Sequence, residues 1–268
     1  MKVILSADDF GRSHEMNLAI DYAMRNKMVY STALIMGSEY TQEAVDMAIA
    51  GGYIGDVHCH LNLAACVKVG NHFVPLSEAY KKGRFCKDGE FANVQYYRAD
   101  FMKYVDLIYQ ELEAQFLAFR EMTKGQANYQ HLDFHRYLNL SPPVAMAYNR
   151  LIKKHHLGSA RFFGEHQSEV NESKKRRLVH AAEMFCWRRH KAFVVKSSRI
   201  EYYLAKLERF AKDEMIELFV HPDYVDGVLM DKTAPVYGTE IRSLEESIEL
   251  VKKSADVEFI SWASLNKN

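Results

Sequence analysis

The chain alternates between short apolar runs and longer segments in which apolar residues recur every three or four positions. The runs are typical of buried strands, and the longer spacing is typical of helices that bury one face. The runs predict strands at residues 3–5, 29–36, 53–63, 128–135, 159–163, 216–220 and 257–260. The spacing predicts helices at residues 13–28, 43–49, 101–119, from 141 onward, 174–191, 200–210 and 239–254. Strands and helices that alternate in this way predict a parallel sheet.

The alternation continues through nearly the whole chain without a linker or a low-complexity tract. At 268 residues the chain fits a closed or nearly closed (β/α) barrel, because such barrels typically need about 250 residues. No GxGxxG or P-loop sequence follows any predicted strand, which weakens the alternative of a doubly wound, nucleotide-binding sheet. We therefore predict one α/β domain over residues 1–268, a TIM-like barrel of mostly parallel strands.

Residues 64–99 interrupt this pattern. Gly70, Pro75, Gly83 and Gly89 punctuate the stretch, and no regular spacing of apolar residues persists through it. A loop of this length inside a compact domain is usually functional. We therefore expect an irregular insertion that serves as a lid or a binding loop.

Composition and charge narrow the class of protein. The hydrophobic share of 48% and the charged share of 26% are ordinary for a globular protein. Lysine plus arginine equals aspartate plus glutamate at 35 each, so the net charge gives no attraction to nucleic acids or anionic membranes. The predicted helix at 174–191 is basic, but without a nucleic-acid-binding motif we interpret it as a solvated face.

Cysteine usage and the start of the chain bear on the compartment. The four cysteines form no CxxC pair, and their spacing does not suggest a disulfide framework. The first residues lack the pattern of a signal peptide, and no apolar run approaches the ~20 residues of a membrane span. We therefore expect a soluble cytoplasmic protein with reduced thiols and with no membrane or nucleic-acid partner.

Acids and histidines gather where the predicted strands end. In a (β/α) barrel these carboxyl ends form the active site. The clusters are Asp8 with Asp9, His58 with His60, His131 with Asp133 and His135, and His221. Alternate residues of a strand share a face, so the members of each histidine cluster point the same way. One carboxylate with imidazoles from separate strands can hold a divalent ion and leave positions open for water.

Each cluster alone has a simpler explanation. An isolated histidine is usually a surface or core residue, and aspartate pairs are common at turns. Two adjacent acids in one site ionise to different extents, which suits one metal ligand and one general base. The clusters together favour a metal site over unrelated features. A bound divalent ion would lower the pKa of its bound water and polarise a carbonyl group.

These residues resemble the YdjC-like carbohydrate deacetylases, the chitooligosaccharide deacetylase group. The resemblance runs from residue 2 to about residue 265 and rests mainly on three motifs in order. The motifs are residues 7–11 (ADDFG), Gly55 with residues 60–63 (HLNL), and residues 131–135 (HLDFH). Further similarities are His221-Pro222, the loop at 87–91, Arg161, and the pair Arg242 and Glu245.

The resemblance implies a distorted (β/α) barrel of the glycoside hydrolase/deacetylase type, often as a homodimer. It implies a divalent metal ion, magnesium or zinc, held by Asp9, His60 and His135. It also implies Asp8 as the general base and His221 as a catalytic histidine near the leaving group. The implied reaction removes the N-acetyl group of a small acetylated carbohydrate and releases acetate and an amino sugar.

The chain departs from the family pattern near the third motif. The family's alternating histidines usually continue beyond position 135, whereas this chain has Tyr137 and Asn139 there. His58 stands where the family often has an apolar residue. We expect these differences to affect the substrate or the groups behind the ligands. The residues expected to contact the ligands or the substrate are His58, His131, Asp133, Tyr137 and Arg161.

Two other interpretations stay open. His58-Cys59-His60 resembles the HxH element of amidohydrolase-type barrels, although those place it on the first strand. A metal held by both His58 and His60 would favour that class of hydrolase. The other interpretation is a non-catalytic sugar-binding barrel, which Tyr137 and Asn139 leave open. The sugar, its chain length, the metal and the oligomeric state do not follow from the sequence.

Overall fold

The computed structural model describes residues 1–65, 72–92, 99–162, 193–205, 207, 215–231 and 243–265. The strands of its main sheet are β1 (Lys2–Phe10), β2 (Ser31–Ile35), β3 (Val57–Leu61), β6 (His131–Phe134), β7 (Ser159–Phe162), β8 (Phe193–Arg199), β9 (Met215–Val220) and β12 (Glu258–Ile260). Neighbouring strands are parallel, in the order β12-β1-β2-β3-β6-β7-β8-β9. The predicted parallel sheet is therefore confirmed.

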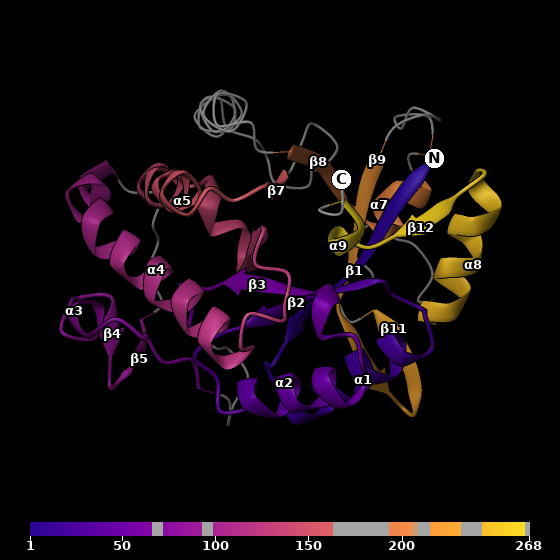
Figure 1. Ribbon diagram of the computed structural model, residues 1–268, viewed down its shortest axis with the longest axis horizontal. Coiled ribbons are helices and arrows are strands. Elements are labelled where there is room, and N and C mark those ends of the chain that lie inside the picture. The colour runs from indigo at the N-terminus through magenta and orange to yellow at the C-terminus, as the bar shows by residue number, and fades with distance from the viewer. Residues whose placement is uncertain are drawn as a thin grey trace.

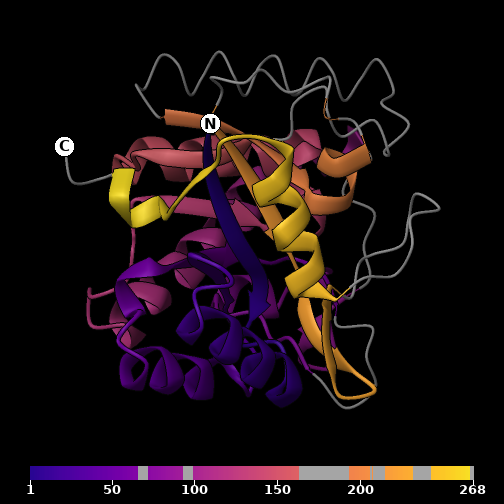
Figure 2. The ribbon, with the colours of Figure 1, turned by 90° about the vertical axis from the view of Figure 1, so that its right-hand side faces the viewer.

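The sheet curls and returns to β1. The last strand of the order, β9, also pairs with β1 over residues 2–7. On the opposite edge of β1, β12 pairs only with residues 2–4 and β2 pairs from Ser6 onward. The strand β12 thus pairs with the start of β1, where β2 does not reach. This extra strand distorts the closed circle of strands that a regular barrel would have. Figures 1 and 2 show β9, β1 and β12 side by side, so the predicted distorted (β/α) barrel is confirmed.

Helices cover the outside of the curled sheet (Figure 1). The longer ones are α1 (His14–Arg25), α2 (Thr41–Ala50), α4 (Val105–Met122), α5 (Pro142–His155), α7 (Ile200–Ala205) and α8 (Leu244–Ser254). The short ones are α3 (Glu78–Lys81), α9 (Trp262–Leu265), and the 3-10 helices η1 (Ile54–Asp56), η2 (Ala99–Tyr104) and η3 (His135–Leu140). The predicted face of α4 is buried at Ile108, Leu112, Phe116 and Phe119. Burying each such side chain contributes about 1.5–3 kcal/mol.

Capping chemistry fixes where three helices begin. Ser13 Oγ accepts a hydrogen bond from the backbone N–H of Met16 at the start of α1. Pro142 occupies the first turn of α5, where its missing N–H costs nothing. Ser243 and Glu246 form a capping box at the start of α8. A side-chain cap typically contributes about 1 kcal/mol.

Some elements differ from the prediction. The hydrophobic pattern predicts neither β8 nor the hairpin of β10 (Pro222–Val225) and β11 (Val228–Asp231). The second half of β8 reads KSSR, so its apolar run is too short to stand out. The predicted strand at 53–63 begins as η1 and becomes a strand only at Val57.

Part of the insertion at 64–99 is regular. It contains α3 and a hairpin of β4 (Cys86–Lys87) and β5 (Glu90–Phe91). The basic segment at 174–191 and Arg242 lie outside the described residues. In the described part of the chain, no helix combines the length and the apolar character needed to cross a membrane.

Candidate active site

The end of β1 directs two adjacent carboxylates to the same side of the sheet. Successive residues of a regular strand point to opposite faces. Here Asp9 has a φ of 69°, in the left-handed region, and the register with β2 shifts between Ala7 and Phe10. Aspartate adopts this conformation more readily than most residues with a side chain. Asp8 and Asp9 are therefore both buried in one polar centre.

Asp9, His60 and His135 bring together donor atoms from β1, β3 and the start of η3. One ligand atom from each lies within 4.8 Å of the other two. Asp9 Oδ1 lies 2.8 Å from His135 Nδ1 and 3.4 Å from His60 Nε2. Arg12 Nη1 donates to the second oxygen, Asp9 Oδ2, at 2.6 Å. These are the three residues that the family resemblance implies as metal ligands.

The chemistry of this group fits a divalent cation. Within the described structure, Asp9 Oδ1 is buried and makes no hydrogen bond of good geometry, although two imidazole nitrogens face it. Burial alone would raise the pKa of Asp9, but His135 and His60 hold that pKa well below its usual value. Burial also lowers the pKa of His135, against the attraction of Asp9. An ionised carboxylate with imidazoles is a mixed oxygen and nitrogen donor set that suits several divalent ions.

Asp133 orients the imidazole of His60. Asp133 Oδ1 lies 2.5 Å from His60 Nδ1, which leaves His60 Nε2 facing Asp9. A carboxylate behind a metal-binding histidine commonly fixes its ring in this way. Burial alone would lower the pKa of His60, but the charge of Asp133 and its hydrogen bond raise it to about 10. Asp133 Oδ2 lies 3.1 Å from His58 Nε2, so both β3 histidines point the same way, as predicted.

Arg161, on β7, binds three carboxylates inside the barrel. Its Nη1 and Nη2 donate to the two oxygens of Asp8 at 2.6 and 2.8 Å. Its Nε and Nη2 donate to Glu217 at 2.8 Å each, and Nη2 also lies 2.8 Å from Asp133 Oδ2. Burial alone would lower the pKa of Arg161, but the three carboxylates raise it well above its usual value. Bidentate pairing of this kind fixes Asp8 in both distance and orientation.

Three residues that the sequence analysis did not single out complete this network. Glu217 accepts hydrogen bonds from Ser197 Oγ at 2.6 Å and from Trp262 Nε1 at 2.9 Å, in addition to those from Arg161. Glu217 is the one charged residue in the run IELFV, and that contrast could have identified it. Ser197 and Trp262 carry no comparable signal, because their role depends on which strands are neighbours.

His58 and His131 lie behind the metal-binding group. The ring of His131 stacks on Trp262 with centroids 3.5 Å apart, and the ring of His58 lies 4.5 Å from that of His131. Burial lowers the pKa of His131 well below its usual value, so this imidazole is neutral. His58, His131 and Glu217 are a second buried group with ligand atoms within 4.8 Å. Both oxygens of Glu217 already accept hydrogen bonds, which makes this group a poorer cation site.

His221, directly after β9, is more exposed than the residues of the metal-binding group. Its side chain is 16% exposed. Its backbone N–H donates to Asp231 Oδ1 at 2.9 Å, and its ring Nδ1 lies 3.9 Å from the same oxygen. Asn139, in η3, is buried, and its Oδ1 has no hydrogen-bond partner among the described residues. The side chain of Tyr137 lies outside the described part of the structure.

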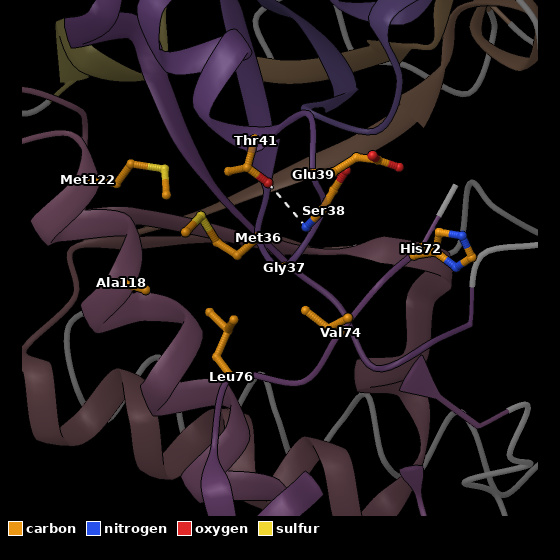
Figure 3. A pocket seen from close by; sticks show the side chains of 10 residues that line it. All are labelled: Met36, Gly37, Ser38, Glu39, Thr41, His72, Val74, Leu76, Ala118 and Met122. Atoms are coloured by element: carbon orange, nitrogen blue, oxygen red, sulfur yellow. Dashed lines mark hydrogen bonds between the residues drawn. The ribbon is translucent and has the colours of Figure 1, made fainter. Parts of the chain in front are cut away.

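Residues 72–77 of the insertion contact this centre through Phe73 and also contribute to the lining of a cavity. The ring of Phe73 lies 6.2 Å from that of His135 and nearly perpendicular to it. Val74 N donates to Gly37 O at 2.8 Å, and a Cβ at Gly37 would lie 2.3 Å from Val74 O. This cavity has a volume of 460 Å³ and is mainly apolar (Figure 3). Its apolar lining residues are Met36, Val74, Leu76, Ala118 and Met122.

Known proteins share both the sequence pattern and the fold. A family model described as "YdjC-like protein" matches residues 2–255. The carbohydrate deacetylase of Clostridium beijerinckii is 23% identical over 273 residues, which cover 99% of this chain and 100% of that protein. The carbohydrate deacetylase of Halalkalibacterium halodurans is 25% identical over 262 residues, which cover 97% of this chain and 100% of that protein. A crystal structure from Enterococcus faecalis V583, described as a cellobiose-phosphate cleavage protein, has a TM-score of 0.69 at 18% identity and covers 98% of both chains.

Proposed function

The chain belongs to the YdjC-like family, and on this basis we propose that it is a metal-dependent hydrolase of acetylated carbohydrates. Its reaction removes the N-acetyl group of a small amino sugar or oligosaccharide and releases acetate. The observation that carries the proposal is the buried group of Asp9, His60 and His135 with the carboxylate of Asp8 beside it. The names of the two full-length relatives support a carbohydrate as the substrate.

Asp9, His60 and His135 would hold the divalent cation. When bound there, such an ion supplies polarisation of the amide carbonyl and a lower pKa for water. Asp133 keeps His60 Nε2 directed toward Asp9. His58 bonds the far oxygen of Asp133 instead of joining this group, which supports the deacetylase reading over the HxH class of hydrolases.

Asp8 is the general base of the proposal. A ligand atom of Asp8 lies within 4.8 Å of one from His60 and one from Asp133, so its carboxylate borders the metal-binding group. Arg161 holds both oxygens of Asp8 and prevents the carboxylate from rotating away. In this position Asp8 takes the proton from the water that attacks the acetyl carbonyl.

His221 is the proton donor of the proposal. Its partial exposure allows its ring to reach a bound substrate, while Asp231 holds its backbone from behind. The departing sugar amine needs a proton to leave, and an imidazolium can supply it near neutral pH.

The test is acetate release from a panel of N-acetylated monosaccharides and oligosaccharides by protein loaded with Mg²⁺, Zn²⁺, Mn²⁺ or Co²⁺. We expect release that stops with chelator, returns with added metal, and is lost in Asp9→Asn. Asp46→Asn, an exposed change on α2, is the matched control and should be fully active. Absence of acetate release across the panel, or release that survives both chelation and Asp9→Asn, would overturn the proposal.

A further inference from the structure

Two buried carboxyl groups meet behind His221. Glu201 lies in the first turn of α7, directly after β8, and is 8% exposed. Asp231 ends β11 and is 3% exposed. The antiparallel register of the hairpin places Asp231 opposite Pro222, the residue that follows His221. Glu201 takes no part in the mechanism described above, and Asp231 enters it only as the acceptor of the His221 backbone N–H.

The contacts join the two carboxyl groups and His221 in a row. Asp231 Oδ1 accepts the hydrogen bond from the backbone N–H of His221 at 2.9 Å and faces the ring Nδ1 at 3.9 Å. The side chain of Glu201 hydrogen-bonds to the side chain of Asp231. Glu201 Oε1 is buried and makes no hydrogen bond to any donor group in the described structure.

Two carboxyl groups in contact need a proton between them, because ionised carboxylates are acceptors only. Burial raises the pKa of Glu201 to about 8, and the charge of Asp231 contributes in the same direction. Arg199, the last residue of β8, acts in the opposite direction with a smaller effect. At neutral pH the proton therefore belongs to Glu201, and Asp231 is the acceptor.

We propose that Glu201 is a positioning residue for His221, acting as a protonated carboxylic acid that donates to Asp231 and fixes the carboxylate on which His221 rests. The inference rests on the proposed function only in giving His221 a catalytic task. The described residues that act on the Glu201 carboxyl group, Asp231 and Arg199, do not belong to the metal-binding group. When Glu201 ionises, two negative charges repel each other beside His221, and the carboxylate that accepts the backbone N–H of His221 loses its fixed position.

The first test does not use activity. The infrared difference spectrum of wild type minus Glu201→Gln at neutral pH should contain the C=O band of a protonated carboxyl group. Burial also raises the pKa of Glu111 to about 7, but its band is common to both proteins and cancels in the difference. Histidine NMR of the metal-loaded protein, with His221 assigned from a His221→Gln sample, should show a step in the His221 chemical shift near pH 8, where Glu201 ionises. That step should be absent in Glu201→Gln and unchanged in Glu258→Gln, an exposed change on β12. The inference is overturned if wild type and Glu201→Gln have the same carboxyl band, or if the NMR step near pH 8 persists in Glu201→Gln.

Kinetics then separate positioning from a merely structural role. Glutamine keeps a hydrogen-bond donor toward Asp231, so Glu201→Gln should keep kcat within about threefold of wild type and lose only the part of the alkaline decline that follows the ionisation of Glu201 near pH 8. Glu201→Ala lacks the donor and should lower kcat by roughly tenfold or more with KM unchanged. Equal losses in both variants would contradict the inference. A wild-type protein that shows the infrared and NMR results but releases no acetate would overturn the proposed function and leave the Glu201–Asp231 pair supported.

Discussion

Asp8 and Asp9 are neighbours in the chain but have different partners. The left-handed backbone at Asp9 lets both carboxylates enter the centre of the barrel. Asp9 faces two imidazoles and Arg12, whereas Asp8 lies in the fork of Arg161. The division between a metal ligand and a base therefore has a structural origin, because each acid has its own cationic neighbour.

Asp8→Asn tests this division at a single residue. An amide at this position cannot take a proton, so kcat for acetate release should fall roughly 10²–10⁴-fold. Cation binding should remain, because Asp9, His60 and His135 are unchanged. Kinetics of acetate release would measure the loss of kcat, and isothermal titration calorimetry with Zn²⁺ and Mg²⁺ would measure the retained cation binding. Activity near the wild-type level would remove Asp8 from the mechanism.

The pH dependence of cation binding follows from His60. Asp133 raises the pKa of His60 to about 10, so below that pH the cation-free imidazole is protonated. A metal needs the Nε2 lone pair, so binding must release this proton. The apparent affinity should therefore rise about tenfold per pH unit between roughly pH 7 and 9. Titrations in buffers of different ionisation enthalpy would measure both the slope and the released proton. Asp133→Asn should flatten the slope, and an affinity that is independent of pH in wild type would contradict the role of His60.

At the scale of elements, a polar residue on α4 holds the wall of the site in place. Glu111 accepts hydrogen bonds from the backbone N–H groups of Leu76 and Ser77, and Gln115 donates to the same carboxyl group. These contacts hold residues 72–77, where Phe73 packs against His135. The insertion is thus anchored to α4 next to the candidate ligands.

Glu111→Ala should detach this segment. The partly buried N–H groups of Leu76 and Ser77 would lose their acceptor, at a cost of about 1 kcal/mol in the free energy of unfolding. Urea denaturation would measure the loss, and hydrogen exchange should locate faster exchange at residues 76 and 77. Glu121→Ala, exposed on the same helix, is the control and should change stability little. Equal stability of the two variants would contradict the anchoring role.

Sequence patterns predict elements well where the chemistry is local. The burial of one face of α4 and the clustering of acids and histidines follow from spacing and from strand ends, whereas the choice of Asp9, His60 and His135 among them came from the family resemblance. Local patterns do not predict three other features. These are the left-handed φ of Asp9, the strand β8, and the hydrogen bonds of Glu217 to Ser197 and Trp262. They depend on which strands become neighbours and in what register, and no local pattern encodes that.

At the scale of the whole molecule, the last described segment closes the barrel around its buried charges. The strand β12 pairs with the start of β1, and Trp262 N donates to Ser31 Oγ at 3.0 Å. Trp262 then stacks on His131 and donates to Glu217. Residues near both ends of the chain therefore cover the same polar network that holds Asp8.

Trp262→Phe tests this closure. Phenylalanine keeps an aromatic ring against His131 but removes one donor from buried Glu217, which should lower the free energy of unfolding by about 1–3 kcal/mol. Urea unfolding would measure the change. Phe259→Leu, in the same segment but without a hydrogen bond to lose, is the comparison and should cost less. An equal or smaller loss for Trp262→Phe would show that the bond to Glu217 is not needed.

The central claim is that a divalent cation binds between Asp9, His60 and His135. Anomalous scattering from a crystal grown with Zn²⁺, recorded on both sides of the zinc absorption edge, tests it most directly. We predict a single strong peak within coordinating distance of Asp9 Oδ1, His60 Nε2 and a ring nitrogen of His135. A peak between His58, His131 and Glu217, or one coordinated by both His58 and His60, would contradict the account.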